Sequence, residues 1–302
     1  MRSQTRAYLY AIAAVLCWST VASAFKLTLD ETGVGELLLL STWASLAVLL
    51  LVMGAQRSFT QWKSWSRREW GHSAILGALN PFLYYLVLFR AYDLLRAQEA
   101  QPLNYTWPIV LVLLSAVVFR QRLHAYTIAA MLVSFAGVLV ISTRGDVTGL
   151  RFTSTEGVLL AVGSSLLWAT SWILNMRSRA AQVPKLAANF LFGALYVATY
   201  VLLSHDHAAI TAGAVVGGVY VGIFEMGLTF VFWLRALTLS KSTAGVSNLV
   251  YLSPFLSLLF IHVLVGEDIA VSTVLGLVLI VSGIVVQRWG EARGARAPSR
   301  QE

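Results

Sequence analysis

The chain contains few charged residues and almost no cysteine. Only 12% of its 302 residues are charged, against ~25% in typical soluble domains, while 58% are hydrophobic. The single cysteine, Cys17, cannot form a disulfide within the chain, which excludes a disulfide-stapled scaffold. This composition also excludes a disordered chain and an ordinary soluble enzyme, and it indicates an integral membrane protein.

Sequence motifs of catalysis and of ATP binding are missing as well. No H-E-x-x-H, G-x-S-x-G or G-x-x-x-x-G-K-[ST] occurs, and no hydrophobic stretch contains a pair of acids. His205-Asp206-His207 has ligand residue types but no third group nearby, so we expect a solvated loop rather than a metal site. The sequence therefore predicts no enzyme, no catalytic residues, no cofactor and no metal.

Ten hydrophobic stretches are long enough to cross a membrane as helices. We place them at 7–27, 35–54, 72–92, 98–119, 125–143, 155–175, 187–204, 213–236, 242–264 and 270–288. The first follows Arg2 and Arg6 and contains Ala22-Ser23-Ala24, as a cleaved signal peptide would. Its length is that of a membrane span, so we predict an uncleaved first helix.

The basic residues predict the orientation of these spans. If the amino terminus is cytoplasmic, seventeen of the 22 Lys and Arg residues lie in cytoplasmic segments and five on the other side. Positive charge concentrates on the cytoplasmic side of membrane proteins. We therefore expect a multi-pass protein of the cell (inner) membrane with both termini in the cytoplasm. The same distribution accounts for the net charge of +8 without a nucleic-acid partner.

The two halves of the chain repeat one pattern. The matching pairs are Trp18 and Trp168, Phe89-Arg90-Ala91 and Leu234-Arg235-Ala236, and Tyr105-Thr106-Trp107-Pro108 and Tyr251-Leu252-Ser253-Pro254. Five spans in each half place the second half upside down relative to the first, as in the inverted repeats of secondary transporters. The predicted fold is an all-α integral membrane protein of ten transmembrane helices. Two inverted five-helix repeats, at 7–143 and 155–288, surround a central cavity and precede a cytoplasmic tail at 289–302.

This pattern resembles the paired EamA-type domains of the drug/metabolite transporter superfamily. The resemblance lies in the Trp of each first helix, the Tyr-x-x-Pro of each fourth helix, and an acid followed by a glycine, Glu267 and Gly283. It covers about 7–143 and 155–288. The first half has Gln121 where the second keeps Glu267, and we expect this position to serve the turn before the last helix of its half. The Trp-rich interior is most similar to YddG-type aromatic amino acid exporters.

Polar residues in the middle of membrane spans mark the predicted cavity, because they are costly unless they face protein or water. The candidates for substrate binding are Trp18, Ser19, Asn80, Tyr84, Tyr105, Trp168, Ser171, Asn175, Glu225, Asn248 and Tyr251. We expect Trp18 and Trp168 on two matching walls, where an indole offers a stacking face and one N–H donor. The alternative is that both rings only fill gaps between helices.

Glu225 is the only acid near the centre of any predicted span, at the position equivalent to Asn80. It could bind the amine of a substrate or a proton, or be a protonated carboxyl bonded to a neighbouring helix. Pro108 and Pro254 each free a carbonyl one turn earlier. That carbonyl could bind substrate or allow a hinge or gate to bend, and the alternative is a kink needed only for packing.

The absence of Lys and Arg from the span centres argues against sugar phosphates and nucleotide sugars, which would need central cations. A neutral or zwitterionic solute with an apolar body fits better, such as an aromatic amino acid or an amphipathic cation. We predict export by alternating access along a solute or ion gradient. The partners are then a small-molecule substrate and the lipid bilayer, and a monomer is expected. The alternatives are a lipid-carrier flippase or multidrug exporter of the same fold and, more distantly, a membrane-embedded enzyme.

Overall fold

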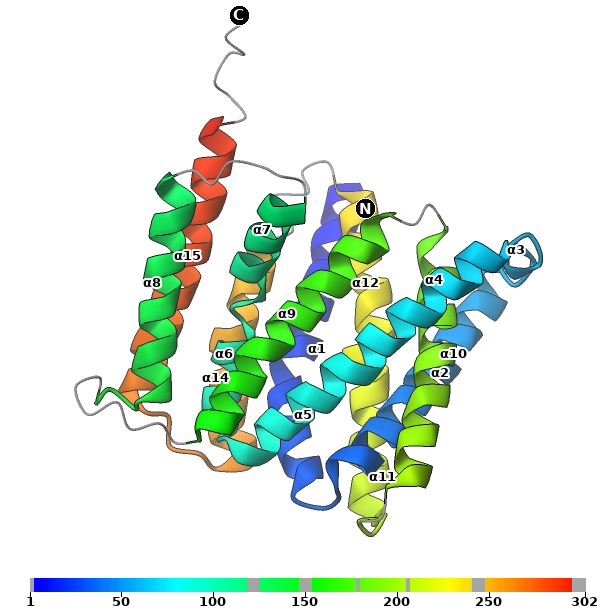
Figure 1. Ribbon diagram of the computed structural model, residues 1–302, viewed down its shortest axis with the longest axis horizontal. Helices are drawn as coiled ribbons and strands as arrows, with labels where there is room; N and C mark the ends of the chain where they lie inside the picture. The colour runs from blue at the N-terminus through cyan, green and yellow to red at the C-terminus, as the bar shows by residue number, and fades with distance from the viewer. Residues whose placement is uncertain are drawn as a thin grey trace, which may run out of the picture.

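The computed structural model describes residues 3–118, 125–146, 154–177, 180–204, 207–240 and 248–294, and every regular element within them is helical (Figure 1). Among these residues, nine helical segments are long and apolar enough to cross a membrane, and a shorter apolar segment, Leu249–Val265, makes the tenth. The predicted all-α, ten-helix membrane fold is confirmed.

The first repeat holds five of these segments. Its elements are α1 (Ser3–Leu29), α2 (Val34–Ala55), the short α3 (Thr60–Lys63), α4 (Arg67–Gly77), η1 (Ala78–Leu83), α5 (Tyr84–Leu94), α6 (Ala97–Asn104), α7 (Trp107–Val118) and α8 (Ala125–Ser142). The third segment combines α4, η1 and α5, and the fourth combines α6 and α7.

The second repeat follows the same plan. Its elements are α9 (Thr155–Arg177), α10 (Gln182–Leu203), α11 (Ala212–Val221), η2 (Gly222–Gly227), α12 (Leu228–Leu239), η3 (Asn248–Leu252), α14 (Ser253–Phe260), η4 (Ile261–Val265) and α15 (Val271–Gly294). Helix α15 continues six residues past 288, so the expected tail begins as helix. The rest of that tail lies outside the described residues.

The helices pair across the two repeats in a symmetric way. Helix α1 packs along α12 and α9 along α5, while α2 packs along α10 and α8 along α15 (Figure 1). If each helix is replaced by its equivalent in the other repeat, the pair of α1 with α12 becomes the pair of α9 with α5. The pair of α2 with α10 and the pair of α8 with α15 are each converted into themselves. A pseudo-two-fold relation between two five-span halves has this consequence, as an inverted repeat requires.

The contact between α8 and α15 depends on two glycines. A Cβ at Gly137 would lie 2.5 Å from the carbonyl oxygen of Gly276, and one at Gly276 would lie 2.7 Å from that of Gly137. Small residues let membrane helices approach closely and pack by van der Waals contact. Gly137 and Gly276 therefore serve the packing of these two helices.

Four of the membrane-spanning segments contain irregular backbone. In η1, Asn80 has φ −149° and ψ 114° and so interrupts the helix. In the equivalent segment, η2 ends at Gly227 with φ −109° and ψ −88°. A turn at residues 105 and 106 separates α6 from α7, and η3 precedes α14. Non-helical backbone at membrane depth is tolerated where it lines a cavity or is buried in protein.

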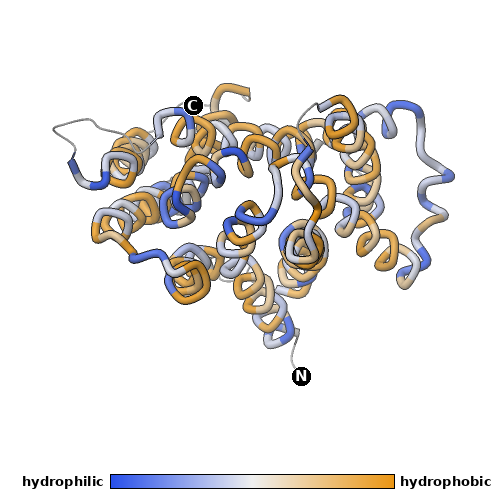
Figure 2. The backbone as a smooth tube through the Cα atoms, turned by 90° about the horizontal axis from the view of Figure 1, so that it is seen from below, coloured by the Kyte–Doolittle hydropathy of each residue, from blue (hydrophilic) through white to orange (hydrophobic). Residues whose placement is uncertain are grey.

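The outer surface of the bundle is apolar. Leu202, Val117 and Val271 are each more than 70% exposed. Figure 2 shows hydrophobic residues over most of the helices and hydrophilic residues in several connections. Contact with lipid avoids the free-energy cost that an apolar surface has in water. Lipid contact does not explain the polar residues of the interior, and these residues line cavities.

Candidate functional site

A cavity of about 100 Å³ lies at the centre of the bundle, bordered by α1, α5, α6, α9 and η2. We call it the central chamber. Five of the predicted substrate-binding residues line it, namely Trp18, Tyr84, Tyr105, Trp168 and Glu225. They come from both repeats. The structure therefore brings together side chains as far apart in the chain as Trp18 and Glu225.

Among the residues that the structure describes, Glu225 is the only charged side chain that lines the central chamber. Its Oε1 accepts a hydrogen bond from the hydroxyl of Tyr85 at 3.0 Å. No ion pair reaches Glu225 from the residues that the structure describes. A carboxylate held in the interior without a cationic partner is expensive, and the Tyr85 hydrogen bond compensates for part of that cost.

Two amides, Asn104 and Gln101, also line the chamber. Asn104 accepts from the Tyr84 hydroxyl at 3.4 Å and donates through Nδ2 to Ser164 Oγ at 2.8 Å. Gln101 Oε1 is buried and has no hydrogen-bond partner among the described residues. Neither amide was among the predicted substrate-binding residues, although Gln101, Asn104 and Tyr105 share one helix face at spacings of three and four.

A second cavity, of about 240 Å³, lies toward the end of the bundle where α9 ends and α10 begins. We call it the vestibule. Four predicted residues line it, namely Asn80, Trp168, Ser171 and Asn175, so Trp168 borders both cavities. No charged side chain of the described part of the chain lines it. The predicted residues thus divide between two neighbouring spaces rather than lining one.

Aromatic rings separate the two cavities. Phe230 on α12 lies 5.8 Å from the Trp168 ring and 6.1 Å from the Trp18 ring, between centroids. Trp168 also contacts Tyr84 at 5.0 Å and Trp107 at 6.4 Å. Phe230 therefore contacts both Trp18 and Trp168, which occupy equivalent positions in the two repeats. Nothing in the sequence distinguished Phe230 from its neighbours in α12.

Both proline-freed carbonyls are bound by the opposite repeat. Pro108 leaves the carbonyl of Asn104 without a helical donor, and Ser165 Oγ donates to that oxygen at 2.8 Å. Pro254 does the same for Val250, whose oxygen accepts from the Tyr105 hydroxyl at 2.7 Å. These carbonyls fasten one repeat to the other. A role of the prolines in gating stays a prediction.

Three predicted residues remain. Two of them line neither cavity, and the side chain of the third is not among those that the structure describes. Ser19 is fully buried and donates to Val15 O within its own helix at 2.6 Å. Tyr251 lines neither cavity, and the guanidinium of Arg288 lies 5.7 Å from its ring centroid. Asn248 begins η3, and its side chain lies outside what the structure describes.

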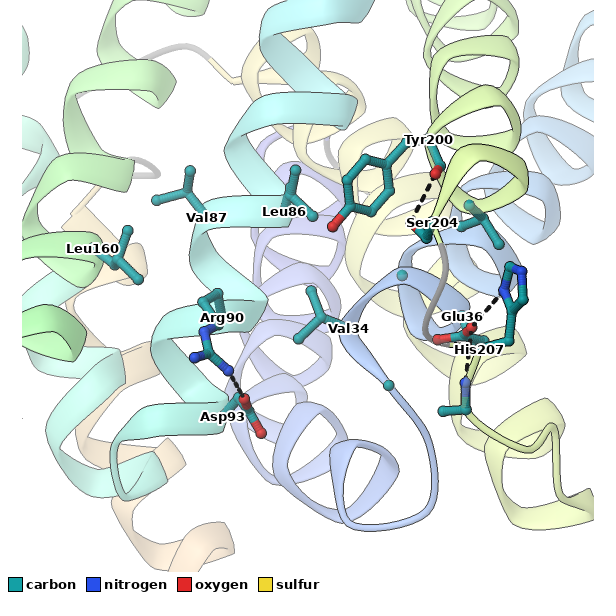
Figure 3. Close-up of a pocket in the computed structure, with 14 residues that line it drawn as sticks. Val34, Glu36, Leu86, Val87, Arg90, Asp93, Leu160, Tyr200, Ser204 and His207 are labelled. Carbon is teal, nitrogen blue, oxygen red and sulfur yellow. Dashed lines mark hydrogen bonds and ion pairs between the residues drawn. The ribbon is translucent and has the colours of Figure 1, made fainter.

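A groove of about 740 Å³ lies at the other end of the bundle, where α5 and α9 face α2 and α10 (Figure 3). None of the predicted site residues whose side chains the structure describes lines it. Its charged groups already have partners: Arg90 pairs with Asp93 at 2.5 Å, and Glu36 Oε1 accepts from the backbone N–H of Ala208 at 3.2 Å. Groups already paired in this way attract a solute less than the unpaired polar atoms of the interior.

Glu267 closes the same end of the bundle by capping a helix of the opposite repeat. Its two carboxylate oxygens accept from Ala97 N at 2.9 Å and Gln98 N at 3.2 Å, at the start of α6. The expectation that this acid serves its own turn was wrong, because its carboxylate reaches free N–H groups across the repeat boundary. Gln121 lies outside the described residues.

From the sequence, we expected the loop at 205–207 to be solvated rather than to bind a metal ion. His205 and Asp206 lie outside the described residues. His207 Nδ1 lies 3.7 Å from Glu36 Oε1. Within the part of the chain that the structure covers, no group of three or more His, Cys, Asp or Glu side chains could hold a metal ion.

Two inverted helical repeats around polar and aromatic cavities define the secondary-transporter class of membrane protein. The EamA-like transporter family model matches residues 5–143 and 155–288, and the chain belongs to this family. A solved structure described as "Crystal structure of protein" has the same fold, with a TM-score of 0.68, 24% identity, and coverage of 97% of this chain and 99% of that one.

Three curated relatives show the range of the family. The probable terminal-alkyne amino-acid exporter of Streptantibioticus cattleyicolor is 25% identical, over 95% of this chain and 96% of its own. The aromatic amino acid exporter YddG of Ancylobacter novellus is 25% identical, over 76% and 79%. The uncharacterized inner membrane transporter YicL of Salmonella typhimurium is 24% identical, over 74% of each chain.

Proposed function

We propose that this transporter exports small neutral or zwitterionic solutes with an apolar body, amino acids with aromatic side chains among them. The observation that carries the proposal is Glu225, an acid without an ion-pair partner among the described residues, set among aromatic rings in a chamber lined by no basic residue. The ammonium group of an amino acid would supply the missing positive charge.

The rest of the chamber suits the other parts of such a solute. The rings of Trp18 and Trp168 offer faces on which an apolar body or an ammonium group can lie, each worth about 0.5–2 kcal/mol. The indole N–H of Trp168 is buried without an acceptor among the described residues and can donate to a carboxylate. The names of the exporters in Streptantibioticus and Ancylobacter support the same solute class.

Alternating access is the mechanism we propose for this export. The third and eighth segments are each interrupted near the middle, at η1 and η2, and these interruptions flank the two cavities. Rocking of one repeat against the other would expose the solute to each side in turn. Seventeen of the 22 basic residues then face the cytoplasm, with both termini inside and the protein in the inner membrane.

Transport by purified protein in liposomes tests this function. The panel contains tryptophan, phenylalanine, leucine, a sugar phosphate, a quaternary amine and a fluorescent lipid. We expect the amino acids to be carried, and Glu225→Gln to reduce their transport about tenfold or more by leaving the ammonium unpaired.

Glu156→Gln is the matched control, because Glu156 lines neither the central chamber nor the vestibule and its closest described partner is Arg90 at 3.6 Å. We expect its transport to stay within about twofold of wild type. Movement of the sugar phosphate or the lipid in place of the amino acids would contradict the proposal, and preference for the quaternary amine would indicate a multidrug exporter.

A further inference from the structure

Two residues that line the vestibule carry a buried side-chain oxygen without a hydrogen-bond partner among the described residues. These atoms are Oδ1 of Asn175 and Oδ1 of Asn189. Buried polar atoms in folded proteins are nearly always satisfied, and each exception needs an explanation. A ligand in the vestibule would supply the missing donors.

The protein holds the two asparagines firmly in place. The carbonyl oxygen of Asn175 accepts from Lys185 Nζ at 3.1 Å, and that of Leu174, one residue earlier, lies 3.1 Å from His72 Nε2. Asn189 is only 3% exposed. Its backbone packs so closely on α4 that a Cβ at Gly77 would lie 2.4 Å from its carbonyl oxygen. The backbone at both positions is therefore held by neighbouring elements.

The walls around these atoms are aromatic and uncharged. Trp172, Phe190 and Trp233 line the vestibule together with Trp168 and Phe230. Its volume of about 240 Å³ is below the ~300–1,000 Å³ of pockets for drug-sized ligands, which suits one ring system. Flat aromatic walls favour a planar ring, and two orphaned acceptors favour a ring whose edge carries an N–H or O–H donor.

We propose that the vestibule is a second solute site, distinct from the central chamber, which binds a planar aromatic ring with a polar edge, such as an indole or a phenol. The ring stacks on the aromatic wall, and its N–H or O–H donates to the side-chain oxygen of Asn175 or Asn189. This inference rests on the proposed function, because the site selects the side chain of a solute that the central chamber selects by its ammonium group.

The position of the vestibule gives the site a place in the transport path. Trp168 borders both cavities, and Phe230 separates them. A solute that travels between the central chamber and the end of the bundle where α9 ends passes this site. The two sites therefore recognise different parts of one solute. Glu225 binds its ammonium group, and the two asparagines bind the polar edge of its ring.

Binding of 5-fluoroindole to the full chain in lipid nanodiscs, followed by ¹⁹F NMR, tests the site separately from transport. This probe carries a ring and an N–H donor but no charge. We expect saturable binding that Asn175→Leu and Asn189→Leu each weaken about tenfold, because leucine keeps the volume and removes the acceptor. Because Glu225 lies in the other cavity, Glu225→Gln should leave the probe's affinity unchanged within about twofold.

Size-exclusion chromatography reports whether each variant is folded, and Asn189→Ser replaces any leucine variant that aggregates. Unchanged binding in folded asparagine variants overturns the inference. An equal loss in Glu225→Gln also overturns it, because the probe would then occupy the central chamber. If the probe binds at the asparagines but no amino acid is transported, the vestibule site stands and the proposed function fails.

Discussion

Phe230 lies between the two tryptophans that the repeat relates, 6.1 Å from Trp18 and 5.8 Å from Trp168. In the proposed mechanism, a solute that moves between the vestibule and the central chamber passes these three rings. At the scale of single residues, we therefore expect aromatic side chains both to stack on the solute and to close its path. Trp168 is the strongest candidate for both roles, because it borders both cavities.

Replacing Trp168 should therefore impair transport more than replacing an indole on the lipid-facing surface. We expect Trp168→Ala, and to a similar degree Trp18→Ala, to lower amino acid transport in liposomes about tenfold through lost stacking. Trp43→Ala is the control, because Trp43 is 46% exposed and lines neither cavity. Unimpaired transport in both interior variants would show that the solute binds elsewhere.

At the scale of helices, the two repeats hold each other through groups at broken or terminal turns. Ser165 and Tyr105 bind carbonyls that prolines have freed, and Glu267 binds the first N–H groups of α6. Gln98 adds a bond from its Nε2 to Asp268 O at 2.8 Å. Alternating access requires some of these contacts to break. We expect the contacts at the start of α6 to break, because they lie at one end of the bundle.

Removing the charge of Glu267 should loosen the start of α6. We expect Glu267→Gln to weaken this cap by about 1–2 kcal/mol, because a neutral amide interacts less with the positive end of the helix. Hydrogen exchange in detergent should then be faster at residues 97–100, and Glu156→Gln serves as the control. Exchange at the wild-type rate would show that the carboxylate charge contributes nothing to the cap.

The candidate site was only partly predictable from the sequence. Five predicted residues line the central chamber, and four line the vestibule with Trp168 in common. Ser19 bonds its own helix instead. Phe230, Asn104 and Asn189 were missed, because an apolar ring or an amide within a span has no mark in sequence that shows which way it faces.

At the scale of the whole molecule, the exchange symmetry of the helix pairs reflects two copies of one fold inserted in opposite directions. The pairs of α8 with α15 and of α2 with α10 lie on either side of the central bundle (Figure 1). The charged residues then decide which face of this nearly symmetric object is cytoplasmic. Orientation is thus a property of the whole chain and is tested at that scale.

Labelling of single cysteines in intact cells should show this orientation. In a Cys17→Ala background, we expect a membrane-impermeant maleimide to label Ala209→Cys, which is exposed between α10 and α11. Gln61→Cys, exposed at the opposite end, should react only after the cells are opened. The reverse pattern would place both termini outside. Labelling of both sites in opened cells controls for reactivity.

The number of spans, the repeat and the family resemblance could all be predicted from the amino-acid sequence. Each depends on one-dimensional quantities, namely the length of apolar runs, the order of matching residues and the distribution of charge. Helical periodicity also showed which residues share a face. Which faces meet could not be predicted in this way, because packing against other helices sets the rotation of each helix about its axis. For that reason the division of the interior into two cavities, with Trp168 between them, could be found only in three dimensions.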